Sequence, residues 1–256
     1  MKIALIGAGN VATCIGPRLK DVGHDIVSVY SRTELSARTL ADKLHVPYTT
    51  SLDSIPRADV FLVMLKDDAL AGIASEIAAI ARGSILLHTA GSIPMDIWRG
   101  AGVSCYGVLY PMQTFSRTSV IEWSGVPLFI EGSSEQVTEQ IRLLALSISP
   151  HVTVLSSEGR LKLHVAAVFT SNFSNHMYAI AQQLLEAEGV PFSVMLPLVR
   201  ETARKVETVS PSEAQTGPAI RGDRGVIEEH LKLLGDTPEI ASLYRLISID
   251  INKELK

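Results

Sequence analysis

The chain has 256 residues, of which 46% are hydrophobic and 20% charged, and its formal net charge is −4. This is the composition of a globular protein with one large domain or two smaller ones. Mild acidity argues against nucleic acid or an anionic membrane as the main partner. The two cysteines, Cys14 and Cys105, cannot form a disulfide framework or a zinc-type motif. Because we find no signal peptide and no run of about eighteen apolar residues, we expect a cytoplasmic protein.

A glycine-rich turn follows the first apolar run, residues 3–6. The sequence GAGNVA has the spacing G-x-G-x-x-A, with Gly7, Gly9 and Ala12 at the small positions. In a strand-turn-helix unit the first glycine permits the tight turn, the second lets a pyrophosphate approach, and the third small residue lets helix and strand pack closely. A plain turn is the alternative. The surrounding pattern favours a dinucleotide-binding turn that includes Asn10 and Val11.

The end of the second predicted strand, residues 25–30, bears on the choice of cofactor. NAD-binding proteins commonly place an acidic residue there to hold the ribose 2′-hydroxyl. This chain instead has Ser31 and Arg32, and a hydroxyl with a guanidinium suits a 2′-phosphate. Glu34 lies nearby and weakens the argument, and Arg32 could be an ordinary solvated arginine. We predict NADP rather than NAD.

Strand and helix patterns alternate as far as residue 156. Apolar runs predict strands, and amphipathic segments between them predict helices. This pattern is typical of a doubly wound α/β domain with a mostly parallel sheet. The predicted strands are 3–6, 25–30, 58–65, 84–90, 103–110, 127–132 and 151–155, and the predicted helices are 10–22, 33–45, 67–81 and 133–148. We therefore assign residues 1–156 to a Rossmann domain that binds NADP.

Ligands in such sheets bind beyond the carboxyl ends of the strands. Three predicted strands end in segments that contain polar or small residues, and these residues are candidates to contact cofactor or substrate. Each could equally be a capping or turn residue. The candidates are Leu65, His88 and Thr89 for the cofactor, Gln113 and Thr114 for the substrate, and Ser92 and Pro111 nearby. His88 is also a candidate proton donor.

From residue 157 the pattern becomes helical, and we predict an all-helical domain over 157–256 for substrate binding and dimerisation. Its first helix, 158–189, carries a polar face that includes His164, Asn172 and Asn175. We consider His164 a candidate proton donor, Asn172 a residue that orients substrate, and Asn175 a substrate contact. A subunit or interhelical contact is the alternative explanation of this face.

The segment QTGPAIRGD, residues 215–223, interrupts the helical pattern. Gly217, Pro218 and Gly222 are suited to a turn, and Arg221 would lie just before a helix N-terminus, where an anion is favoured. We predict that Arg221, with Thr216, binds an anionic substrate group. A salt bridge inside the helical domain is the alternative role for Arg221.

The whole chain resembles the superfamily that joins an N-terminal Rossmann domain to an all-helical domain of the 6-phosphogluconate dehydrogenase type. Its members include pyrroline-5-carboxylate reductase, ketopantoate reductase and the β-hydroxyacid dehydrogenases. It is most similar to the NADP oxidoreductases that carry a Rossmann-like domain and a domain of unknown function. The matching sequences are IGAGNVA, VYSR, HTAGS, LYPMQTF, SNF and TGPAIRGDRGVIEEHL.

The long helix departs from one branch of that superfamily. β-Hydroxyacid dehydrogenases use a lysine and an asparagine one turn apart. Here Lys162 precedes Asn172 by ten residues, about 280° around a helix and some 15 Å along it. The two side chains cannot share one substrate carbonyl, and His164 is the alternative proton donor in that neighbourhood.

These observations predict an NADP-dependent oxidoreductase. Hydride transfer to or from a small carbonyl or imine compound would take place at a cleft between the two domains. The alternative is a non-catalytic NADP-binding sensor or scaffold. In either case we expect a homodimer formed through the helical domain.

Overall fold

The computed structural model describes residues 1–255. It contains two compact units, residues 1–172 and residues 173 onward, and each is described by itself. The first unit extends beyond the predicted boundary at residue 156, because the first part of the long helical segment belongs to it. None of the helices in the described chain is long and apolar enough to cross a membrane.

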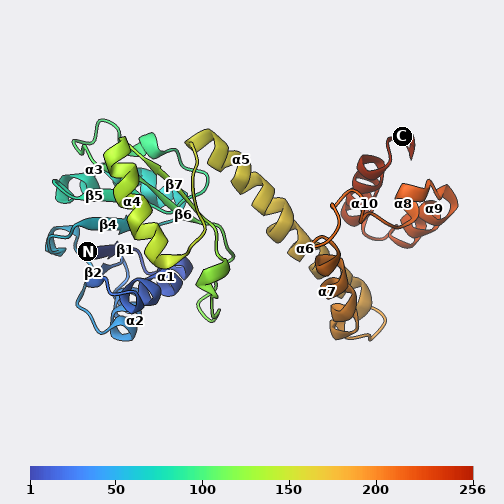
Figure 1. Cartoon of the computed structure of the whole chain (residues 1–256). Helices are drawn as coiled ribbons and strands as arrows, with labels where there is room; N and C mark the ends of the chain where they lie inside the picture. Colours follow the sequence, from blue (N-terminus) through green and yellow to red (C-terminus); the bar gives the residue numbers. More distant parts are fainter. Residues whose placement is uncertain (256) are drawn as a thin grey trace. The chain divides into compact units, whose positions relative to one another are not determined.

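The first unit is built on one eight-stranded sheet (Figure 1). The strand order is β3-β2-β1-β4-β5-β6-β7-β8, and the only antiparallel pair among the described strands is β6 with β7. The strands are β1 (Lys2–Ile6), β2 (Asp25–Tyr30), β3 (Tyr48–Thr49), β4 (Val60–Val63), β5 (Ile85–His88), β6 (Tyr106–Pro111), β7 (Leu128–Gly132) and β8 (Val152–Val154).

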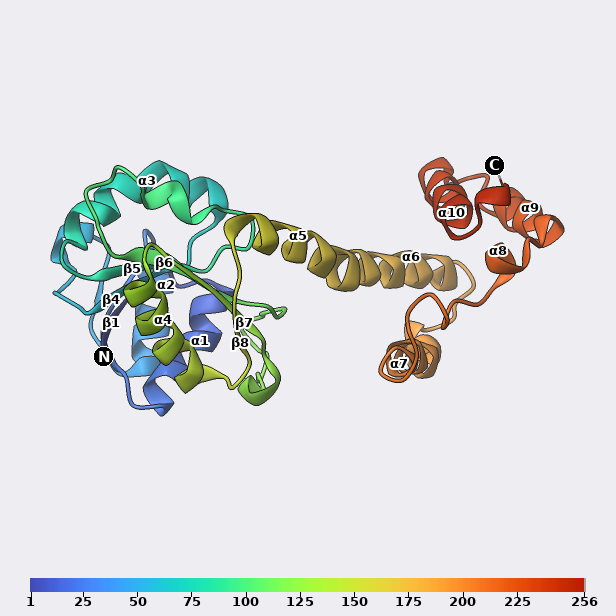
Figure 2. The same ribbon diagram turned by 45° about the horizontal axis from the view of Figure 1, so that its top comes forward.

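Helices cover both faces of this sheet (Figure 2). One face packs against α1 (Asn10–Asp21), α2 (Glu34–Leu44) and α4 (Glu135–Ile148), and the other against α3 (Asp67–Ile80). Alternate residues of each strand enter different cores, so Ile3 and Leu5 face α1 while Ala4 and Ile6 face α3. Burial on both faces explains why the central strands are apolar throughout.

The predicted fold class is confirmed. Every strand and helix expected in residues 1–156 is present, with ends that differ by a few residues. The prediction missed β3, which has two residues and pairs with the end of β2. It also missed α8 (Pro218–Arg221), a single turn within the segment that was expected to interrupt the helices.

The long helix expected at 158–189 is helical but not uniform. It consists of α5 (Ser157–Ala167), a π-helical turn (Val168–Phe173) and α6 (Ser174–Glu186). A π turn has more residues per turn than an α-helix, so it changes which side chains share a face. The predicted spacing of His164, Asn172 and Asn175 along one α-helical face therefore does not hold across residues 168–173.

The second unit continues with helices alone in its described part. After α6 come α7 (Leu196–Lys205), α8, α9 (Arg224–Leu233) and α10 (Pro238–Ile251). Asp223 accepts a hydrogen bond from the amide of Val226 and so caps α9.

Candidate functional site

The glycine-rich turn lies between β1 and α1. Gly7 has φ +116°, and a Cβ there would be 2.4 Å from the carbonyl oxygen of Met64, so only glycine fits. Gly9 is different, because its φ is −85° and a Cβ added there would have no atom within 4 Å. Ala12 is fully buried against the sheet. The turn thus leaves open space at Gly9 beside the unpaired amides that begin α1, and these features fit a pyrophosphate.

Ser31 and Arg32 follow β2 directly. Arg32 is exposed, and no ion pair within 4.0 Å joins it to any described residue. Glu34 accepts a hydrogen bond from the hydroxyl of Tyr48 at 3.1 Å. Glu34, which weakened the case for NADP, therefore has a hydrogen-bond partner within the protein. The guanidinium of Arg32 is available to a ligand.

The other candidates at strand ends lie along the same edge of the sheet. Leu65 follows β4, and its side chain is 3.3 Å from the position of a Cβ on Gly7. Thr89 follows β5, and its amide donates to the carbonyl of Val63 at 3.2 Å. The hydroxyl of Ser92 donates to Asp67. Since β1, β4, β5 and β6 are parallel, their carboxyl ends bring these residues together.

The surroundings of His88 disfavour the role of proton donor. It is fully buried at the end of β5, and its ring lies 6.0 Å from that of Trp98. Its Nδ1 accepts a hydrogen bond from the amide of Ala90 at 3.2 Å. Burial, and then the charge of Arg160, lower the pKa of His88 to about 3. A buried ring with a lowered pKa makes His88 a weaker candidate proton donor than His164, and its role stays a prediction.

A cavity of about 520 Å³ lies within the first unit, at the end of β6 and beside α5. We call it the Tyr110 cavity. Its volume is in the range of small-molecule sites. Its walls are Tyr110, Met112, Gln113, Thr114, Phe115, Leu163, His164, Ala166, Ala167, Val168, Thr170, Ser171 and Asn172. Four candidates from the sequence, Gln113, Thr114, His164 and Asn172, therefore line one space.

The wall of the Tyr110 cavity is hydrogen-bonded to the start of α1. The side-chain amide of Asn10 donates to the carbonyl of Phe115 at 3.0 Å. Asn10 is the first residue of α1, and Phe115 is part of the cavity wall. This hydrogen bond ties the loop after β6 to the glycine-rich turn.

A buried ion pair fixes the first turn of α5. Arg160 is 1% exposed, and its guanidinium donates to Glu131 at 2.6 Å and to the carbonyl of Ile93 at 2.6 Å. Glu131 also accepts from the amide of Ser157 at 2.8 Å and from its hydroxyl at 2.6 Å. These bonds join α5 to β7 and to the loop after β5, and His164 lies one turn further along α5.

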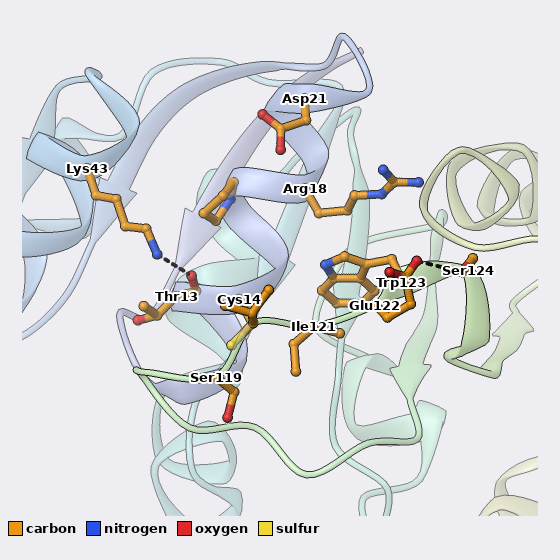
Figure 3. A pocket seen from close by; sticks show the side chains of 12 residues that line it. Thr13, Cys14, Arg18, Asp21, Lys43, Ser119, Ile121, Glu122, Trp123 and Ser124 are labelled. Carbon is orange, nitrogen blue, oxygen red and sulfur yellow. Dashed lines mark hydrogen bonds between the residues drawn. The ribbon is translucent and has the colours of Figure 1, made fainter.

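A second cavity, of about 570 Å³, lies on the outer side of α1 (Figure 3). Two of its polar side chains bond to main-chain carbonyls of the protein. The guanidinium of Arg18 donates to the carbonyl of Ile148 at 2.9 and 3.1 Å, and the thiol of Cys14 donates to the carbonyl of Ser116 at 3.3 Å. Burial raises the pKa of Cys14, which keeps the thiol protonated and unreactive. We therefore place the candidate site in the Tyr110 cavity.

Three predicted substrate residues lie in the second unit. Asn175 is exposed on α6, and Thr216 lines an apolar pocket of about 260 Å³ together with Ala219 and Leu234. Arg221 is exposed at the end of α8, and no ion pair within 4.0 Å joins it to any residue from 1 to 255. The alternative of a salt bridge inside the helical domain is thus not seen, and the roles of Asn175, Thr216 and Arg221 stay predictions.

Several residues of the site could not be identified from the sequence. Tyr110 was assigned only to the end of a strand, and Arg160 only to a helix. A signal existed for the buried pair, because Glu131 is a lone acid in an apolar strand and a charge in that position needs a partner. No local signal marks Tyr110 as a partner of His164, since 54 residues separate them.

Two family models match the chain. One, described as NADP oxidoreductase coenzyme F420-dependent, matches residues 2–91. The other, a domain of unknown function named DUF2520, matches residues 126–251. No curated protein matches the chain.

The solved structures settle the family. A protein of Bacteroides fragilis, provisionally assigned as an NADP oxidoreductase, is 49% identical over 98% of each chain, with a TM-score of 0.93. The chain belongs to this NADP oxidoreductase family. More distant structures share its fold. An imine reductase from Myxococcus stipitatus in complex with NADP⁺ is 17% identical over 100% of this chain and 93% of its own, with a TM-score of 0.65. A 1-pyrroline-5-carboxylate reductase from Streptococcus pyogenes is 17% identical over 99% and 98%, with a TM-score of 0.64.

Proposed function

We propose that this NADP oxidoreductase reduces small imine or carbonyl compounds in the Tyr110 cavity, with NADPH as its cofactor. The hydrogen bond between Asn10 and Phe115 is the observation that carries the proposal. It places a cavity of suitable size next to the turn that fits a dinucleotide. The sequence suggested a cleft between two domains as the reaction site, whereas this proposal requires only residues of the first unit.

Bound NADPH supplies the hydride, and the chain supplies binding, orientation and a proton. Asn172, Gln113 and Thr114 can hydrogen-bond to the polar end of a substrate, and His164 provides an ionisable group in the same wall. Apolar wall residues such as Leu163 and Val168 can contact the hydrocarbon part of a substrate. The π turn supports this arrangement because it brings Ser171 and Asn172 to the same cavity as His164.

NADP is favoured over NAD by the unpaired Arg32 and by the engagement of Glu34 with Tyr48. The imine reductase and the pyrroline-5-carboxylate reductase that share the fold support reduction of a C=N bond as the chemistry. Binding of an anionic substrate group by Arg221, and a cytoplasmic location, remain predictions from the sequence.

We also propose a homodimer formed through the helical unit. Among its described residues, only Ala219, Ile227, Leu234 and Ser248 are buried. Large apolar side chains are exposed on it instead, including Leu198 at 63% and Leu246 at 66%. Exposed apolar surface of this extent supports contact with a second copy of the chain.

The test uses NADPH binding and NADPH oxidation with cyclic imines and 2-oxo acids. Wild type should bind NADPH, and at least one member of the panel should be reduced. Gly9→Ala should leave the melting temperature nearly unchanged, because nothing lies within 4 Å of its Cβ position, and should weaken NADPH binding strongly because the methyl group occupies the space for the pyrophosphate. Binding without turnover of any compound would favour the sensor or scaffold, and undiminished NADPH binding by Gly9→Ala would refute the proposed cofactor site.

A further inference from the structure

Two ionisable side chains meet in the Tyr110 cavity. The hydroxyl of Tyr110 lies 3.2 Å from Nδ1 of His164, and the two rings are arranged edge to face with centroids 6.1 Å apart. Tyr110 comes from β6 and His164 from α5. They are the only tyrosine, histidine, acidic or basic residues in the described wall of the cavity. Tyr110 and His164 are therefore the side chains of this wall best suited to exchange a proton with a substrate.

Gly91 makes room for the pair. A Cβ at Gly91 would lie 2.6 Å from Nδ1 of His164 and 2.9 Å from Cζ of Tyr110. The φ of Gly91 is not in the left-handed region, so space is the reason that this position requires glycine. The loop after β5 is thus shaped around the hydrogen-bonded rings.

The position of His164 is also fixed from its own helix. Arg160, four residues earlier, is held by Glu131 and by the carbonyl of Ile93.

Burial raises the pKa of Tyr110, so its phenol stays protonated at neutral pH and can act as an acid. When Nδ1–H of His164 donates to the phenol oxygen, the phenol hydrogen is free to point at a ligand in the cavity.

We propose that Tyr110 is the residue that protonates the substrate, and that His164 restores the proton to Tyr110. This rests on the proposed reductase function. As hydride reaches the substrate carbon, the C=N or C=O π bond breaks and its electron pair takes the Tyr110 proton, so an N–H or O–H bond replaces the phenol O–H bond. The phenolate takes the Nδ1 proton of the His164 ring. The ring then regains one proton from solvent, so each turnover consumes one hydride from NADPH and one solvent proton.

The first experiment measures NADPH-dependent reduction of 2-methyl-1-pyrroline and 2-oxo acids by Tyr110→Phe. Loss of a general acid should lower kcat by about 100-fold or more, while KM and NADPH affinity change less than threefold. The control is Tyr106→Phe, on the same strand but outside the cavity, which should retain wild-type kcat. A Tyr110→Phe enzyme with kcat within threefold of wild type would overturn the proposal.

The second experiment detects the pair without turnover. NMR of ¹⁵N-histidine-labelled protein, with the His164 signals assigned through His164→Gln, should show that Tyr110→Phe shifts only those signals among the seven histidines. Gly91→Ala should shift them too, since its methyl group displaces the rings. Unmoved His164 signals in Tyr110→Phe would overturn the proposal. If wild type reduces no compound, the proposed function is refuted, and the acid role of Tyr110 with it. If turnover survives in Tyr110→Phe, only the acid role of Tyr110 is refuted.

Discussion

Arg32 follows β2 with an exposed guanidinium and no ion pair to any described residue. If it binds the 2′-phosphate, Arg32→Ala should weaken NADPH binding by about 1.5–3 kcal/mol, the scale of a hydrogen bond to a charged group. NADH, which lacks that phosphate, should bind Arg32→Ala and wild type nearly equally. Fluorescence titration with both cofactors measures this difference.

A matched control for Arg32 is Arg57, which is also exposed but precedes β4 and so lies at the opposite edge of the parallel sheet. Arg57→Ala should leave both affinities unchanged. Tighter binding of NADH than of NADPH by wild type would contradict the prediction that NADP is the cofactor.

His88 provides a prediction of pH dependence. The native imidazole stays neutral down to a pKa of about 3, whereas in the unfolded chain it takes a proton near pH 6.5. Between these values the unfolded state binds more protons, so the free energy of unfolding falls as pH falls, by up to about 1.4 kcal/mol per pH unit from this group. His88→Asn keeps an acceptor for the amide of Ala90 but cannot titrate.

The free energies of unfolding of wild type and His88→Asn are measured with denaturant at pH 7 and pH 5. Both proteins have the same carboxylates, so the difference between them reports the titration of His88. The free energy of unfolding of wild type should fall by about 2 kcal/mol more than that of the variant over this range. An equal fall in both proteins would show that the pKa of His88 in the native state is not lowered from its value in the unfolded chain.

The roles of some single residues can be predicted from the sequence, and those of others cannot. The roles of Gly7 and Ala12 in the turn follow from a local pattern, and the structure gives both the tight packing that the pattern requires. His164 could be singled out because it lies on the polar face of a predicted helix. Tyr110 could not, because its partner is brought to it by the tertiary fold.

At the scale of elements, the attachment of α5 to the sheet depends on Arg160. Arg160→Met would leave the largely buried Glu131 carboxylate without its cation, and loss of one partner of a buried pair costs about 3–5 kcal/mol. We expect a fall of that size in the free energy of unfolding, measured with denaturant. The amide and hydroxyl of Ser157 would still donate to Glu131, which favours the lower end of the range.

The control for Arg160 is Arg142→Met on α4, because Arg142 pairs with Glu139 at 3.2 Å in a partly exposed i,i+3 arrangement. That change should cost less than about 1 kcal/mol. If both variants lose the same stability, the Arg160 pair does not act as a buried anchor.

A helix or strand can be predicted from the sequence when its own residues are enough to make it form. Four apolar residues in succession identify β4, and the amphipathic pattern of α4 begins at a serine that caps it, Ser134. By contrast, nothing in VFTSNF marks a π turn, since the same residues would continue an α-helix. The two-residue β3 is held by its pairing with β2 rather than by its own composition.

At the scale of the molecule, the two compact units differ in how they bury apolar side chains. The first has two cores, one on each face of its sheet, with many residues completely shielded from solvent. The second exposes large aliphatic side chains on α7 and α10. A helical unit with so little buried apolar surface gains stability if a second copy covers those side chains.

Light scattering and a matched pair of substitutions test the dimer. Wild type at micromolar concentration should show about twice the chain mass of 27.6 kDa. Leu198→Glu on α7 should shift the equilibrium toward monomer, because a buried contact would have to accommodate a charge. Leu143→Glu on α4, at the same 63% exposure but in the first unit, should remain dimeric. A wild-type mass near that of one chain would refute the homodimer, and dissociation by Leu143→Glu alone would place the contact on the first unit instead.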